Sequence, residues 1–281
     1  MKTIFPIFLF LITSCIATAQ EEQTIIYSEN TPCIYSQVAN IRQGVGTSSP
    51  ITDKLFLGDN VEIVEYEHDP ADNADVYNWA KISYKKGGIS KEGYTHYQNL
   101  AFTKLTKENI MFLIKTESDN STIEEDYGMG RLVTYKVKAI KENKAIAECE
   151  FKGKIISGIY AWIGTESKLP SNEEKLTNVE NILNIYSPGE ACAIPSFYYY
   201  LAWTGTEILP IMNSWGAGDD SFIEAEEVIF PGNNVPANII LKLYLNGEGE
   251  DGNIETNVYY MEAYKWNGKK AVLLKQSKDK K

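Results

Sequence analysis

The chain has 281 residues, of which 43% are hydrophobic and 12% aromatic, and its formal net charge is -11 at pH 7. This length and its 18 tyrosines favour a strand-rich globular protein with two domains over a disordered chain. The negative charge argues against a nucleic-acid partner and against anionic membrane surfaces, because both are bound through clustered Lys and Arg.

Residues 1–19 have the pattern of a signal peptide. Lys2 supplies the charged start, residues 4–12 are almost continuously apolar, and small residues permit cleavage after Ala19. A competing interpretation is that Cys15 follows a lipobox and is acylated, which would anchor the mature chain to a membrane as a lipoprotein. Both interpretations predict an exported protein, located in the periplasm or cell envelope or secreted.

The most specific pattern lies in residues 38–64, where short strands are predicted between glycine-rich turns. Residues 40–42 form a strand that leads into the loop 43–50, whose glycines permit the positive φ angles of a sharp reversal. After the turn pair Gly58-Asp59, apolar and charged residues alternate through residues 61–65, as they do in a half-buried strand.

Further signals follow at regular spacing. Trp79 opens an apolar strand, residues 86–88 mark a hairpin turn, and residues 93–96 form a closing strand. The pattern resembles the bacterial SH3-like (SH3b) family over residues 24–103, which implies a small barrel. Departures from the family are Val45 in place of proline, Tyr94 in place of tryptophan, and a longer acidic loop over residues 65–78.

The resemblance also implies a ligand groove. Its nearest equivalents in this chain are Tyr35, Arg42, Trp79, Tyr84 and Tyr94. Aromatic rings give contact area at low entropic cost, and Arg42, one of only two arginines, can hold a carboxylate through two hydrogen bonds. The expected partner is a peptide, peptidoglycan or another envelope protein. Trp79 is alternatively a core residue.

A change of composition near residue 104 predicts a domain boundary, with residues 103–109 as a polar linker. Residues 104–275 are expected to form an antiparallel β domain, either a sheet or a sandwich, followed by a basic tail over residues 276–281. Within it, the alternating segments 133–139 and 145–151 predict a hairpin with one face in a core.

One short helix is predicted to interrupt these strands. Ser171 and Glu174 form a capping-box pattern, apolar residues recur at helical spacing from Leu176 to Tyr186, and Pro188 follows. The apolar stripe predicts a lid on the sheet, with a partner-binding helix as the alternative.

Tryptophan residues recur in related surroundings. Residues 161–166 and 202–207 share the pattern A-W-x-G-T-E, and residues 264–269 contain a related W-x-G turn. Each predicts a strand that ends in tryptophan, a tight turn and a returning strand. The region is too short for the four blades of an ordinary β-propeller, so an antiparallel sheet or sandwich is favoured.

The small number of histidines limits the kinds of catalysis that the chain can support. The chain has only His68 and His96, both within the SH3-like region, so residues 104–275 contain none to serve as a general base or zinc ligand. We therefore assign no catalytic residue, metal or cofactor. If the leader is removed, three cysteines remain; Cys149 with Cys192 is the predicted disulfide, and burial of free thiols is the alternative.

Carboxylates are the remaining catalytic candidates. They occur in three groups, at 124–126, at 219–227 and at 248–251, and the first choice for each is a solvated acidic face. Two functions follow from the sequence. The favoured one is an exported, non-enzymatic binding or scaffold protein whose SH3-like domain binds a peptide or cell-wall ligand. The alternative is a cell-wall glycan hydrolase that uses Asp and Glu, including Asp219 and Glu224.

Overall fold

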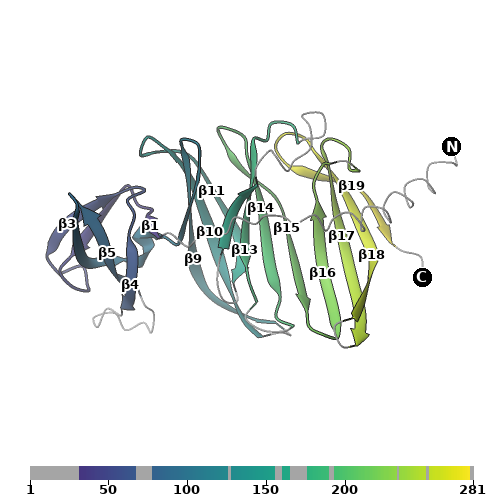
Figure 1. Cartoon of the computed structure of the whole chain (residues 1–281), viewed down its shortest axis with the longest axis horizontal. Helices are drawn as coiled ribbons and strands as arrows, with labels where there is room; N and C mark the ends of the chain where they lie inside the picture. The colour runs from purple at the N-terminus through teal and green to yellow at the C-terminus, as the bar shows by residue number, and fades with distance from the viewer. Residues whose placement is uncertain are drawn as a thin grey trace.

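The computed structural model describes residues 32–67, 78–125, 128–155, 160–164, 176–189, 193–232, 234–250 and 253–278. It is built almost entirely of antiparallel strands. A small N-terminal unit is followed by a four-stranded sheet and then by a long eight-stranded sheet (Figure 1). The predicted mainly β class is confirmed. Within these ranges, no helix has the length and apolar character needed to cross a membrane.

The N-terminal unit holds seven short strands and one 3-10 helix. They are β1 (Cys33–Ile34), β2 (Val38–Arg42), β3 (Ile51–Phe56), β4 (Glu62–Glu67), β5 (Trp79–Lys86), β6 (Ile89–His96), η1 (Tyr97–Asn99) and β7 (Leu100–Ala101). Five of them pair in the order β3-β2-β6-β5-β4, and β1 pairs with β7. The sheet keeps β3 and β4 as edges, so the strand pairing does not close into the barrel that the sequence predicts.

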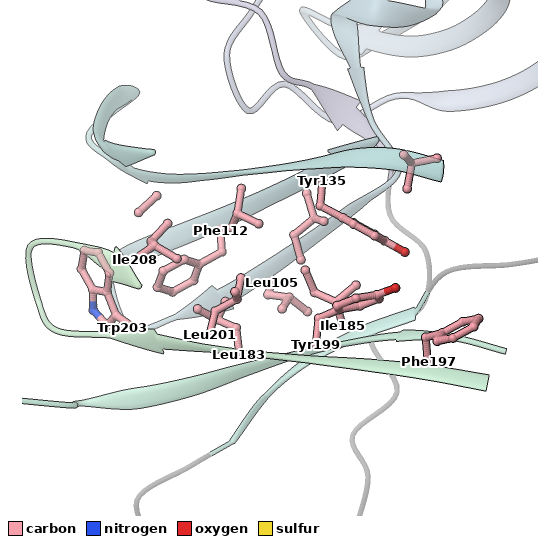
Figure 2. Close-up of a cluster of buried hydrophobic side chains, with 14 residues drawn as sticks. Leu105, Phe112, Tyr135, Leu183, Ile185, Phe197, Tyr199, Leu201, Trp203 and Ile208 are labelled. Carbon is pink, nitrogen blue, oxygen red and sulfur yellow. The ribbon is translucent and has the colours of Figure 1, made fainter. Parts of the chain in front are cut away.

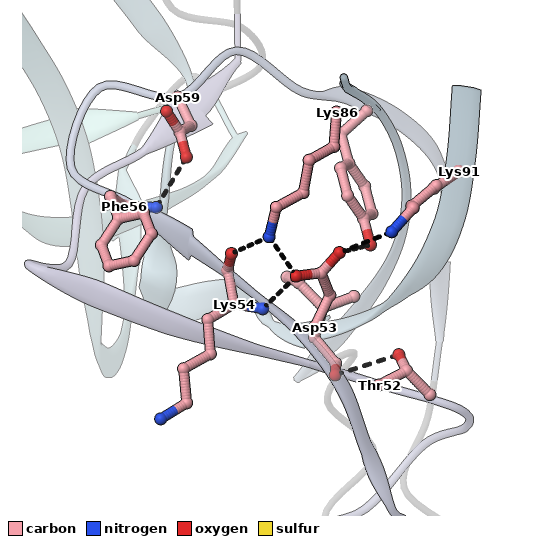
Figure 3. Close-up of polar contacts among 9 residues, drawn as sticks. Thr52, Asp53, Lys54, Phe56, Asp59, Lys86 and Lys91 are labelled. Carbon is pink, nitrogen blue, oxygen red and sulfur yellow. Dashed lines mark hydrogen bonds and ion pairs between the residues drawn. The ribbon is translucent and has the colours of Figure 1, made fainter. Parts of the chain in front are cut away.

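Asp53 on β3 reaches the β5–β6 hairpin, although these elements are not neighbours in the sheet (Figure 3). Its carboxylate accepts hydrogen bonds from Lys86 Nζ, from Lys91 Nζ at 3.0 Å, from the Lys54 backbone N–H at 2.8 Å and from the Tyr84 hydroxyl at 3.2 Å. The hydrogen bond from Lys86, followed by the one from the Lys54 N–H, holds the pKa of Asp53 well below its usual range. Side-chain contacts therefore connect two elements that backbone pairing leaves apart.

The four-stranded sheet begins directly after the N-terminal unit. Its strands, in the order β11-β10-β9-β8, are β8 (Thr103–Lys107), β9 (Ile110–Glu125), β10 (Gly128–Lys141) and β11 (Lys144–Ile155). The prediction of a polar linker at residues 103–109 is wrong because β8 lies there. Thr103 and Leu105 are buried in alternation with Lys104, so only one face of this strand is polar.

The hairpin predicted over residues 133–151 is confirmed. Tyr135 pairs with Phe151 and Val137 with Cys149, which places one apolar face of both strands in the core. Glu142 and Asn143 form the connecting turn with φ angles of 51° and 60°. Two positive φ angles are typical of the turn that best matches the twist of a two-residue hairpin.

The eight-stranded sheet is a meander in which each strand pairs with the next strand in the chain. Its strands are β12 (Tyr160–Gly164), β13 (Asn181–Ser187), β14 (Ser196–Trp203), β15 (Ile208–Gly218), β16 (Phe222–Ile229), β17 (Ile239–Glu250), β18 (Asn253–Trp266) and β19 (Ala271–Lys278). The C-terminal region, which was predicted to be antiparallel β, thus forms two antiparallel sheets in the described residues.

The predicted helix is wrong where the structure describes it, because residues 181–187 form strand β13. Leu183 and Ile185 enter one core and Ile182 enters the core on the opposite face. A strand that is apolar on both faces has a continuous apolar sequence, which spacing alone does not separate from a helix. Ser171 and Glu174, which suggested the helix start, lie outside the described residues.

Two of the three tryptophan turns are seen as predicted. Trp203 ends β14, the Thr204 N–H donates to the Glu207 carbonyl at 3.0 Å, and β15 returns. Trp266 ends β18 in the same way before β19. Both indole rings are buried. Trp162 lies in β12, and the turn expected after it lies outside the described residues.

The four-stranded sheet and strands β13 to β15 pack face to face as a sandwich (Figure 2). Phe112 meets Trp203 edge-on, with ring centroids 5.3 Å apart, and the rings of Tyr135 and Tyr199 lie 5.0 Å apart. Gly153 makes room for the two tyrosines, since a Cβ there would lie 2.5 Å from the Tyr135 ring. Aromatic pairs of this kind add to the stabilisation from buried area.

The outer face of the same four-stranded sheet holds the N-terminal unit. Leu113 of β9 and Ile140 of β10 form a buried cluster with Cys33, Tyr35 and Leu57. Successive residues of a strand point to opposite faces, so β9 and β10 serve the sandwich with one face and this junction with the other. The N-terminal unit is therefore joined to the sheet by packing as well as by the chain.

Candidate functional site

The five residues assigned to an SH3-like groove do not share one surface. Tyr35, Trp79 and Tyr84 are buried, with exposed fractions of 7%, 3% and 4%. Arg42 and Tyr94 are half-buried and face each other across β2 and β6. The Arg42 guanidinium donates to the Ser49 carbonyl at 2.6 Å, so it anchors its own loop.

Tyr35 lies at the junction between the N-terminal unit and the four-stranded sheet. Lys138 Nζ lies 4.2 Å and Lys115 Nζ 4.9 Å from the centroid of its ring, and Lys138 Nζ also donates to the Tyr35 carbonyl at 3.3 Å. A hollow of about 330 Å³ beside it is lined by Lys136 and Cys149, among others. Burial raises the pKa of the Cys149 thiol to about 11, which keeps it protonated and unreactive near neutrality.

The predicted disulfide cannot be followed across both partners. Cys149 and Cys33 are free cysteines in the structure, and Cys192 lies outside the described residues. The Cys149–Cys192 bond therefore stays a prediction. Cys15, the predicted site of lipidation, also lies outside the described residues.

His96 has a structural place. Its Nδ1 accepts a hydrogen bond from the Gln98 N–H at 3.3 Å, at the start of η1, and its ring contacts those of Trp79 and Tyr97 at centroid distances of 5.6 and 5.5 Å. His68 lies outside the described residues.

The predicted carboxylates do not gather in one place. Asp219 caps its own turn by accepting hydrogen bonds from the Ser221 N–H at 2.7 Å and the Phe222 N–H at 3.1 Å. Glu224 sits in the paired part of β16, opposite Ala217 and Asn246. Asp126 and Asp251 lie outside the described residues. Of the three acidic groups, Glu226 and Glu227 line a hollow between β15 and β16.

That hollow lies where β15 and β16 separate. These strands pair only from Gly216 to Gly218 with residues 223–225, next to their connecting turn, whereas each pairs with its other neighbour along most of its length. A Cβ on Gly216 would lie 3.2 Å from the Cβ of Ala225, so glycine permits the close approach at the paired end. Beyond this point the facing backbone edges of β15 and β16 pair with no strand of the described residues.

We call this hollow, of about 540 Å³, the β15–β16 opening. Its wall is formed by residues of β14, β15 and β16 together with two residues that precede β14: Gly189, Ile194, Ser196, Tyr198, Tyr200, Ser214, Trp215, Gly216, Ala217, Gly218, Ile223, Ala225, Glu226, Glu227 and Val228. Consecutive residues of one strand point to opposite faces, and both Glu226 and Glu227 line it. The opening therefore passes between the strands rather than lying on one face of the sheet.

Hydroxyl groups cluster along the β14 side of the opening. Burial raises the pKa of the Tyr200 hydroxyl, and the nearby side chains of Ser214 and Asn184 partly oppose this rise. Ser196 Oγ accepts from the Gly189 N–H at 3.0 Å and lies 3.2 Å from the Tyr186 hydroxyl. Asn184, which is 8% exposed, keeps a side-chain oxygen without a hydrogen-bond partner.

The two glutamates of the opening differ in their charge partners. Glu226 Oε2 lies 2.7 Å from Lys242 Nζ, and both side chains are almost buried. Glu227 forms no ion pair among the residues that the structure describes. The strands beside it desolvate its carboxylate and raise its pKa, although the residue as a whole remains exposed. Within the described part of the chain, the opening therefore carries one carboxylate, that of Glu227, which no lysine or arginine pairs.

A second polar cluster lies near the ion pair of Glu226. The carboxylate of Glu262 accepts hydrogen bonds from the hydroxyls of Tyr244, Tyr260 and Tyr264 at 3.1, 3.0 and 2.5 Å and from Gln276 at 2.8 Å. Burial alone would raise its pKa, but these four donors, led by Tyr264, hold it below the usual value. Glu262 is thus a saturated acceptor with no free position for a ligand.

The arrangement favours holding a molecule over transforming one. A glycosidase needs two carboxylates placed as acid and as base or nucleophile, but Lys242 neutralises one of the two in the opening. Among the described residues, neither histidine nor cysteine lines it, and no group of three or more His, Cys, Asp or Glu is placed to hold a metal ion. What the opening offers is aromatic rings, hydroxyls, one carboxylate and free strand edges.

Sequence reasoning missed the aromatic side of this site. Ser196, Tyr198 and Tyr200 alternate with the core residues Phe197, Tyr199 and Leu201, so period two separates a polar aromatic row from a buried row. Pro210 within β15 is a further signal, because a residue without an N–H is tolerated mainly at strand edges and bulges.

Compared with known proteins, the chain matches no family model, no curated protein and no solved structure.

Proposed function

We propose that this chain is an exported, non-enzymatic binding or scaffold protein that holds a peptide or cell-wall ligand. The observation that carries the proposal is the composition of the β15–β16 opening. Among the described residues, its wall presents Tyr198, Tyr200 and Trp215 but neither a nucleophile with a base nor a second unpaired carboxylate. Aromatic walls with a few polar groups are typical of sites that bind.

Export is supported by the leader pattern of residues 1–19, with membrane attachment only if Cys15 is acylated. An SH3-like assignment for residues 24–103 rests on the sequence resemblance, and the antiparallel pairing of five strands supports it although the sheet does not close into a barrel. In this proposal the N-terminal unit is a scaffold, because most of its expected groove residues are buried.

Cosedimentation with purified sacculi tests the proposal. The leaderless protein is expected to pellet with sacculi, or to bind peptides if the ligand is not the wall itself, and to release no soluble fragments. The opposite result would be that the wild type releases muropeptides and that Glu227→Gln abolishes this release. It would overturn the non-enzymatic assignment and favour the glycan hydrolase. Glu255→Gln, the same change at an exposed residue of β18, is the matched control.

A further inference from the structure

Two features of the β15–β16 opening suit the addition of a strand: its facing edges are not paired with each other, and each edge strand is held firmly on its other side. The edge of β15 up to Trp215 and the edge of β16 from Glu226 onwards face each other without pairing. Each strand is held on its other side, β15 by β14 and β16 by β17. An extended peptide gains main-chain hydrogen bonds from such edges, and its alternate side chains enter the pockets beside them.

The size of the opening suits a short segment. Paired strands lie about 4.8 Å apart, so a guest strand needs roughly twice that separation between its two neighbours. The volume of about 540 Å³ is within the range of roughly 300 to 1,000 Å³ that is common for ligand sites. Val228 and Met212 belong to the core cluster around Ile211, so the opening is closed by packing at the end opposite the turn.

Charge selects the side chain of the guest. Glu226 is neutralised by Lys242, whereas Glu227 has no ion pair among the described residues, and no lysine or arginine lines the opening. A guest ammonium or guanidinium group would complete the charge balance, while a guest carboxylate would meet an unpaired negative charge. Tyr198 and Tyr200 provide rings over which the stem of such a side chain can pack.

Resting on the binding function proposed above, we infer that the β15–β16 opening takes up a short extended peptide as a guest strand, with a lysine or arginine of that peptide paired with Glu227. The guest forms main-chain hydrogen bonds with β15 and β16. Its basic side chain lies beside Glu227 and packs over Tyr198 and Tyr200, and the side chains of its opposite face contact Trp215, which shares a face with Phe197.

Fluorescence anisotropy with defined probes tests this inference. The probe is a labelled heptapeptide, Thr-Val-Thr-Lys-Thr-Val-Thr, with blocked ends; a second probe has Glu at the centre, and a third carries N-methyl groups on alternate amides. We expect the lysine probe to bind the full leaderless chain and the other two to bind at least about tenfold more weakly, as loss of charge-assisted or main-chain hydrogen bonds predicts.

Two variants locate the binding. Glu227→Gln is expected to weaken the lysine probe about tenfold, and Glu224→Gln to leave it unchanged, because Glu224 lies outside the wall of the opening. Equal binding by wild type and Glu227→Gln, or by the N-methylated and unmodified probes, would overturn the inference. If either result were obtained while the protein still pelleted with sacculi, the proposed binding function would stand and only its location in the β15–β16 opening would be wrong. Absence of both pelleting and peptide binding would overturn the two together.

Discussion

Two carboxylates, Asp53 and Glu262, are held ionised by donors that belong to different strands. Asp53 accepts hydrogen bonds from Lys86, Lys91 and Tyr84, and Glu262 accepts them from three tyrosine hydroxyls and an amide. An acceptor with several donors fixes the relative position of the strands that provide them, and its loss leaves the donors unsatisfied.

Asp53→Asn is expected to lower the free energy of unfolding by about 1 to 2 kcal/mol, since charge-assisted hydrogen bonds to half-exposed lysines are lost. The pKa of Asp53 in the folded state is below that in the unfolded state. Its contribution is therefore present above about pH 4 and is lost as the pH falls further. Urea unfolding at pH 7 and pH 3 measures both effects. Asp220→Asn, in the exposed turn, is the control, and equal losses in the two variants would contradict the assignment.

Glu262→Gln is expected to cost about 2 kcal/mol, because an amide has one acceptor oxygen in place of two and four donors compete for it. The pKa of Glu262 is also below its usual value when folded, so this contribution too fades on acidification below about pH 4. Thermal or urea unfolding of Glu262→Gln beside Glu255→Gln, an exposed residue of the same strand, checks it. A change under about 0.5 kcal/mol in Glu262→Gln would show that the cluster is not stabilising.

At the scale of elements, the alternation of apolar and polar residues predicted those strands whose structure depends on local sequence. The hairpin over residues 133–151 was predictable because its strands are polar on one side and its turn residues tolerate positive φ. The same alternation places Ala80, Ile82 and Tyr84 on one buried face of β5. The spacing of Tyr84 from Ile82 therefore indicated a buried position, although the resemblance assigned Tyr84 to a groove. Strand β13 was missed because both of its faces are buried, which removes the alternation.

The opening between β15 and β16 could not be predicted in the same way. Whether two neighbouring strands pair along their whole length depends on the side chains that pack on both faces, and Trp215 and Val228 belong to different core clusters. Local pattern gives the row of Ser196, Tyr198 and Tyr200, but only the assembled sheet places it opposite Glu226 and Glu227.

The junction of the N-terminal unit gives a prediction at this scale. Tyr35→Ala is expected to cost about 3 kcal/mol, because it empties a buried ring position between Lys115 and Lys138, whereas Tyr35→Phe keeps the ring and is expected to cost less than about 1 kcal/mol. Urea unfolding measures the difference. Tyr66→Ala, at a tyrosine that is 54% exposed on β4, is the control. Equal effects at Tyr35 and Tyr66 would show that the junction is not a packed interface.

For the molecule as a whole, composition predicts the mainly β class, whereas the candidate site depends on how the strands pack. The strand-rich class and the net negative charge are apparent from the sequence. The order of the strands, the sharing of β9 and β10 between two cores and the separation of β15 from β16 arise from contacts distant in the chain. A surface that joins Tyr200 to Glu227 is therefore a property of the assembled sheets.

The central claim is that this molecule holds its ligand and leaves it unchanged. Native mass spectrometry of the leaderless protein with the lysine heptapeptide, followed over a day, measures binding and turnover in one sample. The account predicts a one-to-one complex whose peptide keeps its mass, and loss of that complex in Glu227→Gln but not in Glu224→Gln. Shortened or otherwise altered peptide that depends on Glu227 would contradict it.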